Sequence, residues 1–332
     1  MKRCWVSLLC VILLTISANA QAPAGTADAH VAAAKAAARQ DYSGVINLCN
    51  PPQPAAGQRA TPPAQQTNSP AQRTIPPASQ WYAEPAKVFD NLYFIGSKDV
   101  SAWAITTSDG IILIDSLYDY SVEEQIANGL KKLSLDPAKI KYVVVTHGHG
   151  DHYLGSKFLQ DRYGAHIILS EADWNFMAND RNAAQLKPKK DIVATEGQKL
   201  TLGDTTLTLY VTPGHTPGTV SVLFPVKDGN QRHLAGMWGG VGFNFPRTPE
   251  AFKTYGASAR RFQDIVAKAG VDVHLTNHSG QDKTLDKIAA LKTRKPGGPH
   301  PFVVGNDAMK RFLTVVSECA DAQYAWLTSP AK

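Results

Sequence analysis

The sequence predicts a layered α/β sandwich, with strands inside and helices outside. Two short β-branched runs, Ile111–Asp115 and Lys141–Thr146, have the composition of strands buried on both faces. A stretch with helical periodicity separates them, and further strand-like and helix-like segments alternate towards the C-terminus. This mixture over about 250 residues is a tolerable size for one domain.

The segment between the two β-branched runs is predicted to be a helix. Ser121 and Glu124 have the spacing of a capping box at its start. Apolar side chains then recur at close to the helical period, at Val122, Ile126, Leu130 and Leu133. The predicted order is therefore strand, helix, strand.

The second half of the domain is predicted to contain more strands and three helices. The strands are Leu200–Val211, with a turn at Gly203 and Asp204, then Thr219–Val226, His233–Met237 and Val271–Thr276. Two helices flank the last strand, with one apolar face formed by Phe252, Tyr255, Ala259, Phe262 and Val266 and the other by Leu285, Ile288 and Leu291. A final helix is predicted over about 307–327.

The first twenty residues have the pattern of a secretory signal peptide. A basic pair precedes an apolar run over 5–16, and a small-x-small motif ends at Ala20. The alternative is a membrane anchor, but the run is shorter than the roughly 20 residues that a spanning helix needs. We therefore expect cleavage after Ala20, a periplasmic or secreted protein, and no stable membrane insertion after cleavage.

We divide the chain into residues 1–20 as the signal peptide, 21–80 as an N-terminal segment and 81–332 as the main domain. Within the N-terminal segment, an alanine-rich stretch over 24–50 has the composition of a short helix. Residues 51–79 are dominated by proline, glutamine and alanine, which indicates a linker.

Composition limits the classes of function. With 43% hydrophobic and 19% charged residues, the chain has enough apolar material to fold. The net charge of +6, from 34 basic and 28 acidic side chains, falls well short of a nucleic-acid-binding surface. We therefore expect a small-molecule substrate and no nucleic-acid partner, and the oligomeric state stays open.

Two cysteines, Cys49 and Cys319, remain after removal of the signal peptide. In an oxidising compartment an isolated pair is more often bridged than free, so we expect a disulfide between the N-terminal segment and the last helix. The alternative is two unrelated thiols.

A cluster of metal-ligating residue types follows the strand at 141–146. It comprises His147, His149, Asp151 and His152, and glycines lie between them. Glycine lets the backbone turn tightly there, and histidine and aspartate are ligands of zinc. Residues 147, 149 and 151 project in one sense from an extended chain while 152 lies one step on, which favours two neighbouring metals over one.

Two further histidines occur in polar turns at predicted strand ends. His215 lies in the segment TPGHTPG and His278 in TNHSG. Metal ligands belong at such positions because strand ends meet at one edge of a sheet. The remaining histidines lie in less distinctive places and are expected to be structural or on the surface: His30, His166, His233, His274 and His300.

These motifs together resemble the metallo-β-lactamase superfamily of binuclear zinc hydrolases. The resemblance covers about 81–293 and implies a four-layer αββα sandwich, with 81–332 as its catalytic domain. It implies that Asp115, which matches the superfamily's early aspartate, supports the ligand loop. It also implies two Zn²⁺ ions per chain, one held by His147, His149 and His215, the other by Asp151, His152 and His278.

One difference from the common superfamily pattern points to a particular subclass. Many members of the superfamily carry a metal-bridging aspartate on the strand between the last two histidines, but here that strand, HLAGMWGG, has neither an aspartate nor a cysteine. The remaining ligand set resembles that of subclass B3 metallo-β-lactamases. It implies hydrolysis of a β-lactam amide bond by a metal-bound hydroxide that Asp151, the catalytic residue, orients.

Two alternative functions stay open. One is hydrolysis of a lactone, ester or thioester on the same metals, and the other is a metal-binding envelope protein without turnover. Substrate contacts are expected from the loop 174–190 and from Trp238 and Asn244, although a packed tryptophan and an ordinary solvated loop are equally compatible with the sequence.

Overall fold

The structure is a computed structural model that describes residues 25–52 and 75–329. The expected signal peptide and most of the expected linker lie outside these residues. In the part of the chain described, no helix is long and apolar enough to cross a membrane.

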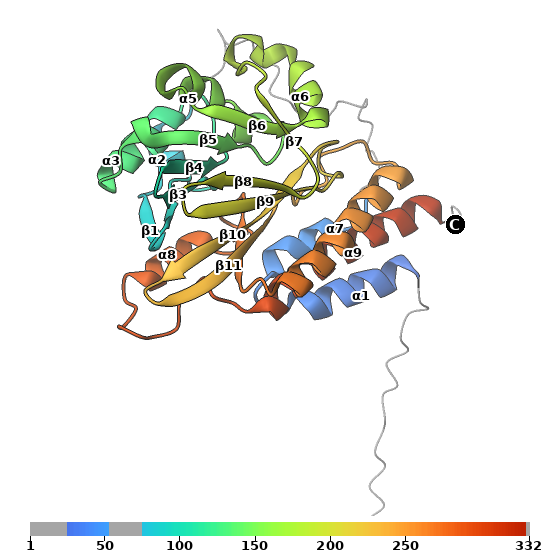
Figure 1. Ribbon diagram of the computed structural model, residues 1–332. Coiled ribbons are helices and arrows are strands. Elements are labelled where there is room, and N and C mark those ends of the chain that lie inside the picture. Colours follow the sequence, from blue (N-terminus) through green and yellow to red (C-terminus); the bar gives the residue numbers. More distant parts are fainter. Residues whose placement is uncertain (1–24, 53–74, 330–332) are drawn as a thin grey trace, which may run out of the picture.

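Twelve strands form two sheets in the described residues (Figure 1). The seven-stranded sheet has the order β1(Ala86–Phe89), β2(Leu92–Phe94), β3(Trp103–Thr107), β4(Gly110–Ile114), β5(Ile140–Val144), β6(His166–Ser170) and β7(Ile192–Ala194). The five-stranded sheet has the order β12(Val273–Thr276), β11(Gln231–Trp238), β10(Val220–Asp228), β9(Thr205–Val211) and β8(Gln198–Leu202).

Helices cover the outer faces of both sheets. Those associated with the seven-stranded sheet are η2(Glu123–Asn128), α3(Gly129–Lys132), η3(Pro137–Lys139), α4(Gly150–Tyr153), α5(Ser156–Tyr163), α6(Glu171–Ala178) and η4(Arg181–Leu186). Those that follow or flank the five-stranded sheet are α1(Ala27–Ala38), η1(Ser43–Cys49), α7(Pro249–Ala269), α8(Thr284–Leu291) and α9(Asn306–Thr328). The short helix α2(Ala78–Trp81) precedes β1.

Alternating side chains divide the interior into three apolar layers. In β4, Ile112 and Ile114 face the layer between the two sheets, whereas Ile111 and Leu113 face the helices. In β9, Leu207 and Leu209 join the central layer from the opposite sheet. A third layer packs the five-stranded sheet against α1, α7 and α9, which lie side by side in Figure 1. The expected αββα sandwich is therefore confirmed.

Strand directions bring several strand ends to one edge. β4, β5 and β6 are parallel, so their carboxyl ends lie together. In the other sheet β9 and β11 are both antiparallel to β10, and β12 is parallel to β11, so the carboxyl ends of β9, β11 and β12 also share one edge. All the expected ligands follow these strand ends.

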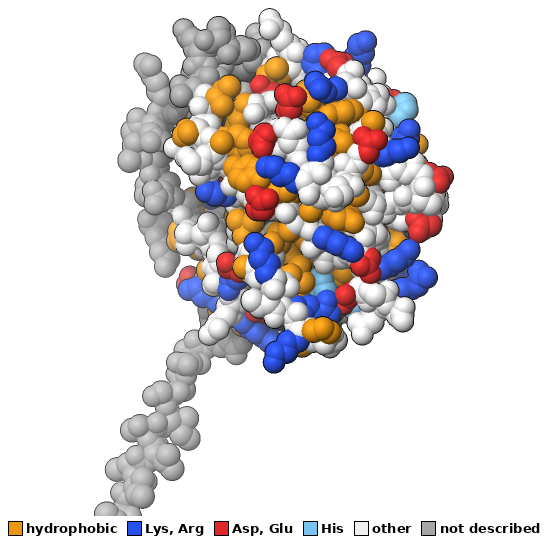
Figure 2. Space-filling model, turned by 90° about the vertical axis from the view of Figure 1, so that its left-hand side faces the viewer, with side chains coloured by type: hydrophobic (Ala, Val, Ile, Leu, Met, Phe, Trp, Pro, Cys, Tyr) orange, Lys and Arg blue, Asp and Glu red, His pale blue; other side chains and the backbone are white. Residues whose placement is uncertain are grey.

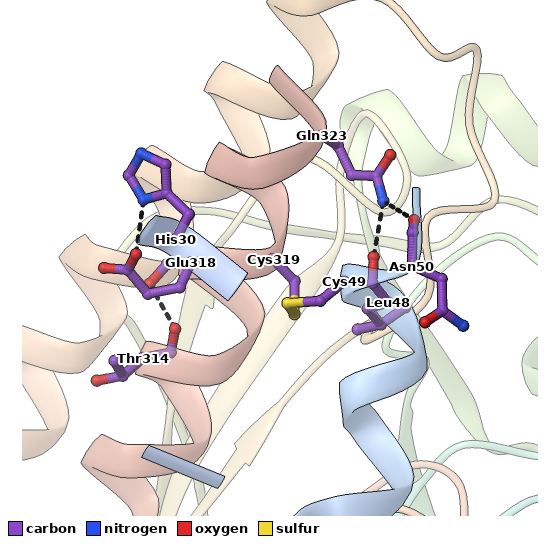
Figure 3. Close-up of a disulfide and its surroundings, with 9 residues drawn as sticks. His30, Leu48, Cys49, Asn50, Thr314, Glu318, Cys319 and Gln323 are labelled. Carbon is purple, nitrogen blue, oxygen red and sulfur yellow. Dashed lines mark hydrogen bonds and ion pairs between the residues drawn. A yellow bond between two sulfur atoms is a disulfide. The ribbon is translucent and has the colours of Figure 1, made fainter. Parts of the chain in front are cut away.

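The N-terminal segment packs on the same core as the main domain. Ala34, Tyr42 and Val45 are buried in the layer that also contains residues of α7 and α9. The structure has the expected disulfide from Cys49 to Cys319 of α9, and the Gln323 side chain donates to the backbone oxygens of Leu48 and Asn50 (Figure 3). Residues 27–50 are thus held against α9 at several points.

Reducing this disulfide should destabilise the fold. The bridge joins residues 270 positions apart, so it restricts the unfolded chain strongly. We expect Cys49→Ser with Cys319→Ser to lower the free energy of unfolding by about 2–4 kcal/mol, measured by urea denaturation. Reductant should shift the midpoint of the wild-type protein and leave that of the double variant unchanged. Equal midpoints for the two proteins without reductant would contradict the expectation.

The surface carries charges of both signs. On the face shown in Figure 2, lysine and arginine side chains are interspersed with aspartate and glutamate, and no extended region of one sign is visible. This distribution agrees with the modest net charge of the sequence.

Candidate metal centre

The loop after β5 carries four of the candidate ligands. His147 and His149 precede α4, and Asp151 and His152 lie within that short helix. The turn after β4 supports the loop, because the buried carboxylate of Asp115 accepts hydrogen bonds from the backbone and side chain of Thr146 at 2.7 and 2.9 Å. Asp115 has a φ of 63°, a left-handed conformation that is uncommon outside glycine. This turn directs its side chain back towards the loop.

Three histidines from two loops converge. His147 Nε2 lies 3.0 Å from His215 Nε2, and His149 Nδ1 lies 3.1 Å from the same atom. His147 Nδ1 donates to the Gly239 carbonyl at 2.8 Å, and His215 Nδ1 donates to the Gly242 carbonyl. Since a carbonyl can only accept, both Nδ1 atoms carry the hydrogen, and each neutral ring presents a bare Nε2 lone pair to the other.

Burial keeps these rings neutral. Desolvation, with the neighbouring histidines, holds the pKa of His147 well below its usual range. Desolvation is also the main cause that lowers the pKa of His149 to about 4 and that of His215 to about 3. Lone pairs of unprotonated rings that face one another at about 3 Å repel unless a cation lies among them. The first cluster therefore fits a metal ion.

A second cluster lies beside the first. Asp151 Oδ2 lies 3.2 Å from His152 Nε2 and 3.5 Å from His278 Nε2, and the rings of His147 and His152 are 4.1 Å apart between centroids. His152 Nδ1 donates to Asp115 at 2.8 Å, and its fully buried Nε2 has no hydrogen-bond partner in the described residues. A buried, oriented ring nitrogen that makes no hydrogen bond to a described residue and lies beside a carboxylate fits a second metal.

The charges of this cluster favour an ionised aspartate. Burial alone would raise the pKa of Asp151, but His152, His278 and His149 together hold it well below its usual range. Burial likewise opposes a charge on His152, but the carboxylates of Asp151 and Asp115 raise the pKa of His152 to about 10. The structure thus brings all six sequence-predicted ligands into two adjoining groups.

Asp173 was not predicted from the sequence, and it connects the two ligand loops. Its Oδ2 accepts hydrogen bonds from Gly148 N at 2.8 Å and Thr216 Oγ1 at 2.7 Å, and its Oδ1 accepts from Gly218 N at 2.7 Å. Gly148 lies between two candidate ligands, and the other two partners, Thr216 and Gly218, follow His215 in the sequence. Burial raises the pKa of Asp173, and these three hydrogen bonds oppose the shift. No local sequence pattern around Asp173 marks this role.

The glycine pair after β11, Gly239 and Gly240, packs closely against the two histidine loops. The Gly239 carbonyl accepts from His147 and also from Asn277 Nδ2 at 2.7 Å. A Cβ atom at Gly240 would lie 2.5 Å from the His215 ring, and one at Gly239 would lie 2.1 Å from the Val220 carbonyl oxygen. The backbone itself occupies the space beside the histidines, so a side chain at either position would not fit.

A cavity of about 310 Å³ opens on the histidines. It is lined by Gly44, Asp99, His147, His215, Val241, Gly242, Asn244, Asn277, His278, Gly280 and Gln281. Asn244 therefore lies where the sequence analysis expected it. Trp238 does not line the cavity, because it is fully buried against Tyr255 and Phe262 and its indole N–H donates to the Tyr255 hydroxyl at 3.2 Å.

The loop 174–190, which was expected to provide substrate contacts, contributes no residue to the lining of this cavity. Trp174 is buried and donates to the Ile192 carbonyl, and Lys187 and Lys190 donate to Ala178 and Glu171 of α6. The Phe176 ring lies 5.6 Å from the His149 ring between centroids. The histidines expected to be structural have other partners: His30 with Glu318, His166 with Asp191, His233 with Asp272, His274 with Tyr42 and His300 with Val88.

Comparison with known proteins agrees with this fold and site. Residues 95–228 match the model of the metallo-beta-lactamase superfamily. The αββα fold and the two histidine-rich clusters agree with this match, and members of that superfamily are metal-dependent hydrolases.

Solved structures of subclass B3 metallo-β-lactamases share the fold. The enzyme of Bradyrhizobium japonicum is 28% identical with a TM-score of 0.62, and the similarity covers 71% of this chain and 91% of that one. A mutant of the enzyme from Legionella gormanii is 25% identical with a TM-score of 0.62, covering 71% and 92%.

One curated relative is named for a reaction other than β-lactam hydrolysis. Hydroxyacylglutathione hydrolase of Acidiphilium cryptum is 37% identical over 86 residues, which is 26% of this chain and 31% of the relative. The chain matches less than two thirds of the length of such curated relatives.

Proposed function

We propose that this protein is a secreted binuclear zinc hydrolase that opens the amide bond of β-lactams. The observation that carries the proposal is the pair of adjoining clusters built only from histidine and aspartate, without an aspartate on β11. Similarity to subclass B3 enzymes over about nine tenths of their length supports the substrate class.

The six side chains would divide between two zinc ions. His147, His149 and His215 would hold one, and Asp151, His152 and His278 the other; this nitrogen-rich set suits zinc. Bound zinc supplies a Lewis acid and lowers the pKa of water towards neutrality.

The chain's own residues orient the reactants. Asp151 directs Oδ2 towards His152 and His278, which leaves Oδ1 to accept a hydrogen bond from the attacking water. Asp115 fixes the tautomer of His152, and Gly239 and Gly242 fix those of His147 and His215. These hydrogen bonds hold the rings before the substrate arrives, which reduces the reorganisation that the reaction requires.

A thioester or ester substrate is the second candidate. It is favoured by the 37% identity to a hydroxyacylglutathione hydrolase, although that match covers only 31% of the relative. Against it, β11 and the glycine pair after it carry no aspartate that could bridge two metals.

A direct assay separates the candidates. We expect zinc-loaded protein to hydrolyse a chromogenic cephalosporin and a carbapenem faster than an acyl-lactone or an acyl-glutathione thioester, measured as kcat/KM. Faster turnover of the lactone or thioester would replace the proposed function with the second candidate. Binding of zinc without turnover of any substrate would indicate a metal-binding protein.

Secretion is part of the proposal. The pattern of residues 1–20 supports it, and so does the disulfide, because such bonds persist mainly in oxidising compartments. N-terminal sequencing of protein recovered from the periplasm should begin after Ala20. A mature protein that retains residues 1–20 would contradict the expected cleavage.

A further inference from the structure

We propose that Gly44, Asp99 and Gln281 form a subsite beside the metal ligands that binds a positively charged, hydrogen-bond-donating side group of the substrate. The inference rests on the proposed function, because it concerns the same cavity. It goes further by stating which β-lactams the cavity favours.

The charge of the cavity lining favours a cationic group. The residues that line the cavity include no lysine or arginine, and apart from the candidate ligands Asp99 is the one charged side chain among them. Asp99 Oδ1 lies 3.9 Å from His278 Nδ1. In the described part of the chain, no lysine or arginine forms an ion pair with Asp99. A cationic group that enters the cavity would therefore meet a carboxylate that no described lysine or arginine neutralises, and this attraction offsets repulsion from the two zinc ions of the proposed function.

Hydrogen-bond acceptors are the second argument. Gln281 Oε1 and Asn277 Oδ1 belong to residues that line the cavity, and both oxygens are buried without a hydrogen-bond partner in the described residues. The orientation of the Asn277 amide is fixed, because its Nδ2 donates to the Gly239 carbonyl. Buried acceptors are costly to leave unpaired, so a ligand that brings N–H donors gains more here than one that brings only acceptors.

The cavity wall formed by Gly44 and Gly280 leaves space for a bulky group. Gly44 belongs to η1, and a Cβ atom built on it would meet only the Gly280 carbonyl oxygen, at 3.9 Å; one built on Gly280 would meet nothing within 4 Å. These two glycines leave one wall of the cavity open to a bulky group. The wall is held in place by Cys49, at the end of η1, through its disulfide to α9 (Figure 3).

Three penicillins test the subsite. Benzylpenicillin, ampicillin and carbenicillin differ only in the substituent on the side-chain carbon, which is a hydrogen, an amine or a carboxylate. At slightly acidic pH, where the amine is protonated, kcat/KM should be highest for ampicillin and lowest for carbenicillin. Asp99→Asn should reduce the ratio of ampicillin to carbenicillin by on the order of tenfold, because it removes both an attraction and a repulsion. Added salt should shrink the ratio in the wild type more than in the variant.

The control is Asp109→Asn. Asp109 is an exposed carboxylate in the turn between β3 and β4, at the opposite end of β4 from Asp115, and it does not line the cavity. This variant should keep the wild-type ratio. A ratio unchanged in Asp99→Asn, or a wild-type preference for carbenicillin, would overturn the subsite.

A binding experiment separates the subsite from the reaction. Calorimetric titration of zinc-loaded protein with phenylglycinamide, phenylacetamide and the monoamide of phenylmalonic acid presents the same three side groups without a lactam ring. If no penicillin is hydrolysed, the proposed function fails, but tighter binding of phenylglycinamide that depends on Asp99 would still support the subsite. Equal binding of the three amides would overturn it.

Discussion

Replacing Asp151 with alanine is expected to lower kcat/KM for a β-lactam by about 10³-fold or more. The carboxylate lies between His152 and His278 at 3.2 and 3.5 Å, so the variant loses both a ligand and the acceptor that orients the attacking water. The three histidines of the first cluster do not depend on Asp151. Metal analysis should therefore find about one zinc per chain instead of two, with the fold retained by circular dichroism.

Asp161→Ala is a suitable control for this variant. Asp161 is an exposed carboxylate of α5 whose recorded partner is Lys157, and its loss should change neither turnover nor metal content. Near-normal kcat/KM in Asp151→Ala would contradict the role given to the carboxylate. Loss of both zinc ions would instead show that the two clusters bind metal as one unit.

Asp173→Asn is expected to weaken the metal site although Asp173 is not itself a candidate ligand. The buried carboxylate accepts three hydrogen bonds from two ligand loops, and the amide would place an N–H₂ group against at least one N–H or O–H donor. Each lost hydrogen bond to a buried charged group costs about 1.5–3 kcal/mol, so we expect the free energy of unfolding to fall by about 3 kcal/mol. Zinc affinity of the first cluster should fall as well, because Gly148 and His215 lose their common support.

Denaturant unfolding and competition with a chromogenic chelator would measure the two effects of Asp173→Asn. Asp191→Asn is the matched control: Asp191 also accepts a backbone hydrogen bond, from Ile167, but it lies on the surface away from both clusters. The control should lose little stability and no zinc affinity. Wild-type stability and affinity in Asp173→Asn would refute the idea that this carboxylate joins the loops.

The sequence indicates the six residues of the two clusters because their signal is local. Histidine, aspartate and glycine alternate within six residues, and His215 and His278 follow recognisable strands. Asp173 has no such signal. Its partners are two backbone N–H groups and a threonine hydroxyl that are remote in sequence, and an aspartate inside a helical stretch looks like an ordinary exposed residue.

Two other regions, residues 86–107 and 238–244, could not be predicted correctly for a different reason. The strands β1, β2 and β3 are short, and the sequence does not predict them. Trp238 lies one residue from the glycine pair beside the histidines, but strand alternation turns its side chain into the core, away from the cavity.

The sequence by itself determined the sandwich, the ligand types and the cysteine pair, because periodicity and residue chemistry are properties of short segments. Only the tertiary structure decided that Gly44 of η1 lines the cavity, that Asp99 is the charged side chain lining it besides the ligands, and that the backbone of Gly239 and Gly240 packs against the histidine loops. These features depend on which distant segments meet at the sheet edges, and that is fixed by the packing of the whole core rather than by any local pattern.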